Sequence, residues 1–309
     1  MDKYSRPLFY KETAKLFLEM VLDIPQSNPD FEIYAKRIAQ EESEPFGDKS
    51  TKSKKFRDSR WREDKDRLIL HRRIFEEMLT KKRLENDDDV CLGAGGGLPV
   101  NSSVKTEKKA FYVMGLPASG KSSVCTDLCE QFGAFLLDND LVKRKLPEYY
   151  QTRGASLVHD EASQLTTISK DGDKSIMEEC MDQGYNLCIP KIGSTTLTVT
   201  NTMDVLRNRG YQTYVLLVSL ERQKATQRAF RRYLKTNRYV PLGLIFDSYA
   251  NDPIMSYYRL RLYLERQDTQ FFDEMAAISS DVPKGQKYSI IDEQYAKGQL
   301  EQYLKNLKQ

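Results

Sequence analysis

Several residue types are scarce in this chain of 309 residues, and each scarcity argues against a class of protein. Only two histidines are present, His71 and His159, which argues against histidine-rich metal chemistry. The five cysteines are odd in number and show no C-x-x-C spacing. They predict buried thiols and no disulfide framework or zinc site.

Long apolar runs are also missing. No stretch of about 18 apolar residues is present, as a membrane-spanning helix requires, and the N-terminus lacks the apolar segment of a secretory signal. We therefore expect a cytoplasmic protein. The net charge of +3, with 30% charged and 39% hydrophobic residues, is typical of a soluble protein. It is too small to indicate nucleic acid or an anionic membrane as a partner.

The pattern along the chain predicts two regions joined by a linker. Residues 1–84 show helical periodicity and no strands, with an apolar stripe on Leu70, Ile74 and Met78. Residues 85–109 are rich in Asp and Gly, which indicates a turn-rich connection. From residue 110 to 309, apolar runs alternate with helical segments. This alternation predicts an α/β domain of three layers with a mostly parallel sheet and a site at the carboxyl ends of its strands.

The most informative motif is a phosphate-binding loop of the form G-x-x-x-x-G-K-S. It follows an expected strand at 110–114 and precedes an expected helix at 122–131, which is the context that this motif requires. Backbone N–H groups of such a loop surround the phosphates of ATP, while its lysine adds a positive charge and its serine hydroxyl binds Mg²⁺. The residues predicted to bind ATP are Gly115, Leu116, Pro117, Ala118, Ser119, Gly120, Lys121, Ser122 and Ser123, with Ser122 as the metal ligand.

Two carboxylates follow the second expected strand, at 134–137. Asp140 is the predicted base that accepts the proton of an acceptor hydroxyl, as a kinase requires. The alternative is that Asp140 caps the helix that begins near Leu141. Asp138 is predicted to belong to the substrate site, and for it a structural role and binding of a Mg²⁺-bound water are equally open.

Further candidates lie on later segments. Arg228, Arg231, Arg232 and Arg238 form a basic cluster that resembles an arginine-bearing lid over a phosphate, although two of the four are expected only to face water. His159 is predicted to hydrogen-bond the substrate, with a structural role equally open. Glu161 lies two residues further along the same early helix and is predicted to contact the acceptor.

Together these segments resemble the zeta toxin family of P-loop kinases over residues 105–260. The resemblance rests on the phosphate loop, on the stretches 137–140, 146–149, 158–162 and 182–187, and on the arginine-rich stretch 231–241. It implies transfer of phosphate from ATP, with Mg²⁺, to a hydroxyl of a nucleotide-linked metabolite. In the family this metabolite is commonly UDP-N-acetylglucosamine, and a related branch uses NAD.

The resemblance also implies residue roles. Lys121 and Ser122 would hold ATP and Mg²⁺, Asp140 would be the base, and Arg232 and Arg238 would be the lid arginines. One stretch departs from the family pattern, because residues 190–196 read Pro-Lys-Ile-Gly-Ser-Thr-Thr where relatives carry an acidic residue and a Thr-Gly-Arg group. Lys191 and Ser194 are the candidate substrate contacts there, and the acceptor is expected to differ from the usual one.

Three questions stay open at this level. The first is whether the chain is a kinase or a degenerate P-loop protein that binds nucleotide and acts through protein contacts; a GTPase is disfavoured because no N-K-x-D sequence is present. The second is whether residues 1–84 inhibit or cap the nucleotide cleft, or whether their apolar stripe only completes the core. The third is whether a separate antitoxin binds the chain, as the family resemblance implies.

Overall fold

The computed structural model describes residues 7–43, 49–85, 93–151, 153–167, 174–266, 270–283, 286 and 288–307. Part of the expected linker and Cys91 lie outside these residues. The other four cysteines are buried and free, as predicted. Within the described ranges, no helix combines the length and apolarity that a membrane crossing needs.

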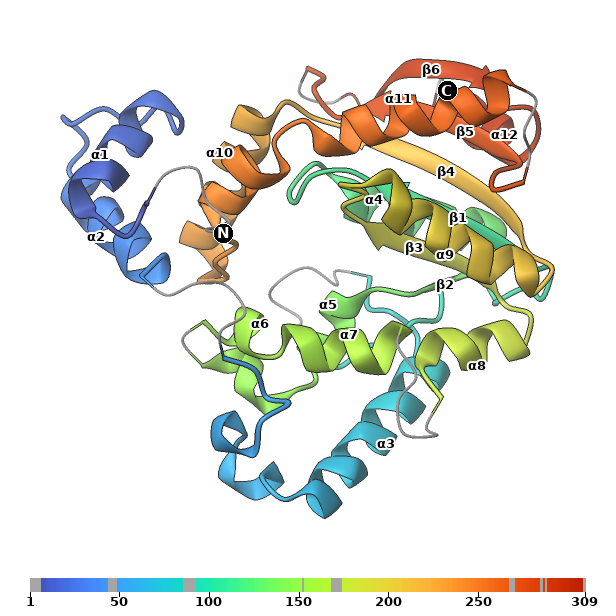
Figure 1. Cartoon of the computed structure of the whole chain (residues 1–309), viewed down its shortest axis with the longest axis horizontal. Helices are drawn as coiled ribbons and strands as arrows, with labels where there is room; N and C mark the ends of the chain where they lie inside the picture. Colours follow the sequence, from blue (N-terminus) through green and yellow to red (C-terminus); the bar gives the residue numbers. More distant parts are fainter. Residues whose placement is uncertain are drawn as a thin grey trace.

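A six-stranded sheet forms the centre of the molecule (Figure 1), and its strand order is β2-β3-β1-β4-β5-β6. The first five strands are parallel and β6 pairs antiparallel with β5, so the expected mostly parallel sheet is confirmed. The strands are β1 (Lys109–Met114), β2 (Ala134–Leu136), β3 (Asn186–Lys191), β4 (Gln212–Ser219), β5 (Glu274–Ser279) and β6 (Ser289–Tyr295).

Helices cover both faces of this sheet. α4 (Lys121–Phe132) and α12 (Gln299–Leu307) lie on one face, and α9 (Thr196–Asn208) and α11 (Asp252–Glu265) lie on the other. The ring of Phe111 in β1 stacks on Phe132 of α4 at 4.7 Å, which fixes α4 against the central strand. The other helices and turns of this part of the chain are α5 (Asn139–Lys143), η3 (Pro147–Tyr150), α6 (Gly154–Leu157), α7 (His159–Thr167), α8 (Ile176–Asp182), α10 (Arg222–Thr236) and the π-helical turn η4 (Leu244–Tyr249).

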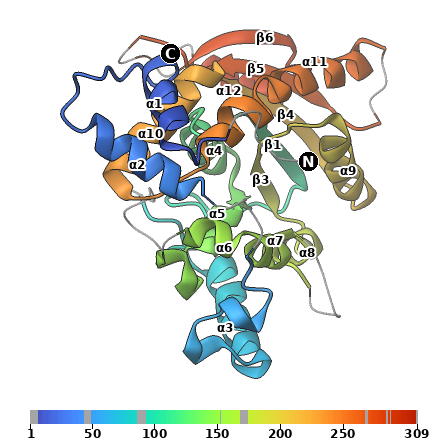
Figure 2. The ribbon, with the colours of Figure 1, turned by 60° about the vertical axis from the view of Figure 1, so that its left-hand side comes forward.

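The N-terminal helices are present as expected, but they pack on two separate parts of the chain (Figures 1 and 2). α1 (Lys11–Met20) and α2 (Phe31–Glu41) form a hairpin against α10 and η4, and Phe17 of α1 meets Phe246 of η4 edge to face at 5.7 Å. After the short turns η1 (Lys54–Phe56) and η2 (Ser59–Trp61), α3 (Asp64–Thr80) lies beneath α7. The predicted stripe of α3 is fully buried in the main core, so it does complete that core.

The glycine-rich part of the expected linker is closely packed. Gly97 donates its N–H to the carbonyl of Met78 at 2.8 Å and accepts from Leu136 N at 2.8 Å, which ties α3 to β2. A Cβ at this glycine would lie 2.2 Å from the ring of Phe135. Only glycine allows this approach, so the segment is a structural bridge between the N-terminal region and the sheet.

Candidate active site

The predicted phosphate loop connects the central strand β1 to helix α4. Gly115 has φ +152°, and a Cβ there would lie 2.4 Å from the carbonyl oxygen of Val218 in β4. Gly120 adopts a left-handed conformation and directly precedes α4. The backbone N–H groups at the start of this twelve-residue helix therefore surround the position where an anion binds favourably.

Lys121 occupies the loop itself. Its Nζ donates to the carbonyls of Gly115 at 2.8 Å and Leu116 at 2.7 Å. Burial lowers the pKa of Lys121 to about 8. The ammonium group is thus held inside the loop by neutral acceptors, which a phosphate can replace.

A cleft of about 1020 Å³ opens at this edge of the sheet. Five predicted ATP-binding residues line it: Pro117, Ala118, Gly120, Lys121 and Ser122. Gly115, Leu116, Ser119 and Ser123 are not among its lining residues. Leu116 and Ser119 are buried, whereas Ser123 is exposed. These four therefore shape or flank the loop, while the other five face the ligand space.

Asp138 and Asp140 line the same cleft at the end of β2. Asp138 caps α5, because its side chain accepts a hydrogen bond from the N–H of Asp140 at 2.9 Å. Burial and the neighbouring Asp140 raise the pKa of Asp138. The alternative role considered for Asp140, that of helix cap, is therefore wrong, and Asp138 fills it.

Asp140 pairs with two cations. Its carboxylate forms ion pairs with Lys143 at 2.9 Å and with Arg238. Burial alone raises the pKa of Asp140, but Lys143 and Arg238 outweigh burial and hold this pKa well below its usual range. Asp140 is ionised across the physiological range, as a proton acceptor must be.

Three of the four arginines in the basic cluster line the cleft: Arg228, Arg232 and Arg238. Arg228 donates to the hydroxyl of Ser280 at 3.0 Å. Arg231 is exposed and is not among the lining residues. The expectation that two of the four only face water is therefore wrong, because α10 and the turn after it direct all but Arg231 toward the ligand space.

Three predicted substrate contacts lie on other walls of the cleft: His159 at the start of α7, Lys191 at the end of β3, and Ser194 before α9. Burial and the positive charge of Lys143 lower the pKa of His159 to about 4, so this imidazole is neutral at physiological pH. Burial also lowers the pKa of Lys191. The structure thus brings these side chains together with the phosphate loop.

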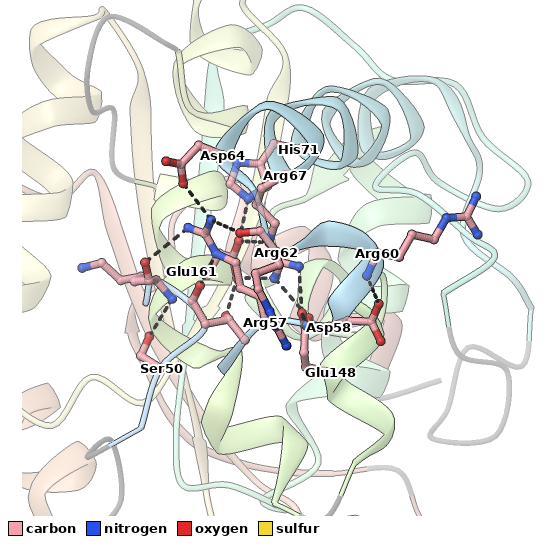
Figure 3. A network of polar contacts seen from close by, with 12 residues as sticks. Ser50, Arg57, Asp58, Arg60, Arg62, Asp64, Arg67, His71, Glu148 and Glu161 are labelled. Atoms are coloured by element: carbon pink, nitrogen blue, oxygen red, sulfur yellow. Dashed lines mark hydrogen bonds and ion pairs between the residues drawn. The ribbon is translucent and has the colours of Figure 1, made fainter. Parts of the chain in front are cut away.

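Glu161 is the exception, and the prediction that it contacts substrate is wrong. Its carboxylate lies in a buried network outside the cleft, where it pairs with Arg67 and with His71, each at 2.6 Å (Figure 3). Arg67 also bonds both carboxylate oxygens of Glu148. Arg67 and His71 lie in α3, which is distant in sequence from Glu161, so the sequence around His159 could not predict these partners.

Further charged residues line the cleft that sequence reasoning missed. Glu41 is the last residue of α2, Glu42 follows it, and Arg83 follows α3, so the N-terminal region contributes to the walls. Among the residues that the structure describes, nine lysines and arginines line the cleft against four carboxylates. The cations are Arg83, Lys121, Lys143, Arg144, Arg153, Lys191, Arg228, Arg232 and Arg238.

A phosphate loop at the end of the central strand of a mostly parallel sheet defines a P-loop fold of the nucleotide-binding class. Residues 100–253 match the model of the zeta toxin family. The chain therefore carries a zeta toxin domain and belongs to the zeta toxin family of P-loop kinases.

Two curated relatives support this placement. Over 127 residues, the chain is 29% identical to Toxin zeta of Streptococcus pyogenes and 28% identical to Toxin zeta of Enterococcus hirae. Each match covers 40% of this chain and 44% of the relative, so the chain spans less than half the length of these relatives.

Similar solved structures include the PezAT chromosomal toxin-antitoxin system of Streptococcus pneumoniae. That likeness has 17% identity and a TM-score of 0.45, and it covers 70% of this chain and 76% of the other. The crystal structure of AvrRxo1-ORF1:AvrRxo1-ORF2 with sulphate ions has 12% identity and a TM-score of 0.45, with 69% and 63% covered. At this level of similarity, neither structure informs the chemistry of the cleft.

Proposed function

We propose that the chain is a kinase that transfers the γ-phosphate of ATP to a hydroxyl group of a nucleotide-linked metabolite. The observation that carries the proposal is the meeting of three groups in one cleft. Lys121 and Ser122 lie on the phosphate loop, and Asp140 lies in α5, which follows β2. Arg232 and Arg238 line the same cleft from α10 and the following turn.

The proposed reaction uses each group in one role. The acceptor hydroxyl oxygen attacks the γ-phosphorus, its proton passes to the carboxylate of Asp140, and the bond to the bridging oxygen breaks to leave ADP. Lys121, Arg232 and Arg238 neutralise the charge on the phosphoryl oxygens. Asp138, Asp140 and Arg232 are close enough to Lys121 to influence its pKa, so the proposed base and the proposed phosphate ligands share one electrostatic environment.

The residues present also fit Mg²⁺. Ser122 offers a hydroxyl oxygen in the first turn of α4, and Asp138 offers a carboxylate on the facing wall. Hard oxygen donors of this kind, completed by phosphate oxygens and water, suit this cation. When bound, Mg²⁺ would neutralise charge on the ATP phosphates.

The acceptor is proposed from the family, with one reservation drawn from the wall after β3. UDP-N-acetylglucosamine is the first candidate. The stretch 190–196 lacks the acidic residue and the arginine expected for that sugar, and it offers Lys191 and Ser194 instead. A lysine at that wall suits a negative group on the acceptor. NAD, which a related branch of the family uses, and other dinucleotides form the second candidate class.

The experiment is a transfer assay with the full chain. ADP release is measured with Mg·ATP and a panel of UDP-sugars and dinucleotides, and mass spectrometry identifies any acceptor that gains one phosphate group. The Asp140→Asn variant serves as the matched control because it keeps the side-chain shape. If neither protein shows acceptor-dependent ADP release or product, the alternative function is favoured, a nucleotide-binding protein that acts through protein contacts; equal product formation in both would instead show that Asp140 is not the base. A comparison of metabolites in cells that produce the wild type or Lys121→Ala would then search for acceptors outside the panel.

We propose a structural rather than inhibitory role for the N-terminal region. The α1–α2 hairpin packs beside α10, and only Glu41 and Glu42 of its helical end reach the cleft. This arrangement supports a cap that shapes one wall and leaves the cleft open. A separate antitoxin remains a proposal from the family resemblance, and co-purification with the product of a neighbouring gene would test it.

A further inference from the structure

The strongest unexplained feature of the cleft is Arg83. Arg83 is only 7% exposed, yet it lines the cleft. Its Nη2 donates to the hydroxyl of Thr126 at 3.1 Å, whereas among the described residues its Nε and Nη1 have no hydrogen-bond partner. Buried donors left in this state are costly, so such a group in a native protein requires an explanation.

The backbone around Arg83 is held rigidly. The N–H of Arg83 donates to the carbonyl of Leu98 at 2.9 Å, and Gly96 donates to the carbonyl of Lys82 at 3.1 Å. A Cβ at Gly96 would lie only 2.3 Å from the carbonyl oxygen of Lys81. The glycine-rich bridge therefore packs directly on the segment that carries Arg83, and the guanidinium is positioned before any ligand arrives.

The partner of Arg83 locates it relative to the phosphate loop. Thr126 donates its own hydroxyl to the carbonyl of Ser122 at 2.9 Å, so Arg83 lies one helical turn along α4 from the proposed metal ligand. Leu136, at the end of β2, lines the cleft as well and leads to Asp138. Arg83 thus belongs to the wall formed by α4 and β2, while α10 and its following turn supply the arginines proposed to contact ATP.

We propose that Arg83 binds an anionic group, a phosphate or a carboxylate, on the acceptor molecule. This inference rests on the proposed kinase function and adds that an anionic group of the acceptor lies against the wall formed by α4 and β2. The unpaired N–H groups on Nε and Nη1 can donate to the oxygens of such a group, because a guanidinium presents several N–H donors in one plane. The surplus of cations over carboxylates in the cleft also suits a second anion beside ATP.

Calorimetry tests the proposal with inorganic phosphate as the probe. The full chain is first saturated with Mg·AMP-PNP, which fills the phosphate loop, and phosphate is then titrated. We expect a phosphate site in the wild type and at least tenfold weaker binding in Arg83→Met. Arg231→Met is the matched control, because Arg231 is exposed outside the cleft lining, and it should bind phosphate as the wild type does.

The outcomes distinguish failure of the Arg83 proposal from failure of the kinase proposal. Binding of Mg·AMP-PNP without a phosphate site, or with equal phosphate affinity in Arg83→Met, overturns the inference and leaves the kinase proposal standing. Failure of the wild type to bind Mg·AMP-PNP overturns the kinase proposal and, with it, the inference.

A second measurement guards against a folding defect. Without added anions, Arg83→Met should unfold at a temperature equal to or above that of the wild type, because the change removes unpaired buried donors. Added phosphate should raise the unfolding temperature of the wild type more than that of the variant. Arg83→Lys keeps the charge without the planar fork and should show intermediate phosphate affinity. A less stable Arg83→Met together with full phosphate affinity in Arg83→Lys would assign Arg83 a structural role and overturn the inference.

Discussion

Arg238 and Asp140 form a direct ion pair in the cleft. Arg238, the proposed lid arginine, therefore contacts the proposed base directly, and Lys143 pairs with the same carboxylate at 2.9 Å. When ATP phosphates attract Arg238, the carboxylate loses one cation and becomes a better proton acceptor. The pair thus links arrival of the nucleotide to readiness of the base.

The first prediction concerns the base itself. Asp140→Asn should lower the turnover of the acceptor by roughly 10²–10⁴-fold, which is the usual contribution of a general base. Nucleotide affinity should hold or rise slightly, because a negative charge near the phosphates is removed. Turnover of an identified acceptor and calorimetric binding of Mg·AMP-PNP check the two parts. A large loss of nucleotide binding would contradict a role confined to the acceptor.

The second prediction uses the effect of Arg238 on the pKa of Asp140. In Arg238→Met one of the cations that lower this pKa is lost, so the pKa rises and the acidic limb of the rate profile moves to higher pH. Turnover at the optimum should also fall, by about 10³-fold if Arg238 stabilises the transferred phosphoryl group. A pH profile of turnover measures both effects. Arg231→Met is the control, and an unshifted acidic limb in Arg238→Met would show that the pair does not govern the base.

The third prediction follows from the pKa of Lys121, which burial lowers to about 8. Phosphate binding requires the charged lysine, so nucleotide affinity should be constant below about pH 8 and fall as pH rises above it. Binding in that range should take up a proton. Calorimetry in two buffers of different ionisation enthalpy measures this uptake. Lys121→Ala should bind weakly at every pH and take up no proton; the same uptake in that variant would assign the proton elsewhere.

Sequence reasoning predicted the parts of the site that are local in the chain. The phosphate loop, Asp140 and the lid arginines are encoded by short motifs with fixed geometry, and the structure brings them to one cleft. The missed strand β5 reads Glu-Met-Ala-Ala-Ile-Ser, and its alanines carry little strand signal. Glu161 and Arg83 depend on contacts between segments far apart in sequence, and only the folded chain reveals such contacts.

The fourth prediction concerns the cap formed by α1 and α2. Glu42 is buried and accepts hydrogen bonds from the hydroxyl of Tyr239 at 2.7 Å and from Leu242 N at 2.9 Å, so α2 holds the segment that follows Arg238. Tyr239→Phe should lower turnover while nucleotide affinity is kept, and it should cost about 1 kcal/mol of stability. Tyr34→Phe is the control, since Tyr34 bonds the exposed Asp30. Equal turnover in both variants would show that the cap does not position Arg238.

Point variants test this cap better than truncation does. A chain that begins near Val104 would lose α3, whose Leu70, Ile74 and Met78 are fully buried in the main core. Removing such side chains costs several kcal/mol each. Loss of activity in the truncated chain would therefore report unfolding, whereas Tyr239→Phe leaves the core intact.

The last prediction separates the structural role of Glu161 from the catalytic site. Burial raises the pKa of Glu161, but hydrogen bonds from Arg67 and His71 lower it to about 2, against an ordinary value of 4.5. The ionised carboxylate therefore stabilises the fold fully above about pH 4.5, and this contribution is lost as the pH falls toward 2. Glu161→Gln removes one of the two carboxylates that pair with Arg67, and Arg67 is only 1% exposed. Breaking a buried pair in this way typically costs about 3–5 kcal/mol.

Thermal unfolding between pH 7 and pH 3 measures this contribution. The wild type should lose stability steeply below about pH 4.5, and Glu161→Gln should start lower and show a shallower decline. At a temperature where the variant is folded, its Michaelis constant for the acceptor should equal that of the wild type, because Glu161 lies outside the cleft. Asp160→Asn, one residue away, should leave stability nearly unchanged. If Glu161→Gln unfolds like the wild type but binds the acceptor more weakly, Glu161 contacts the substrate and its structural role is wrong.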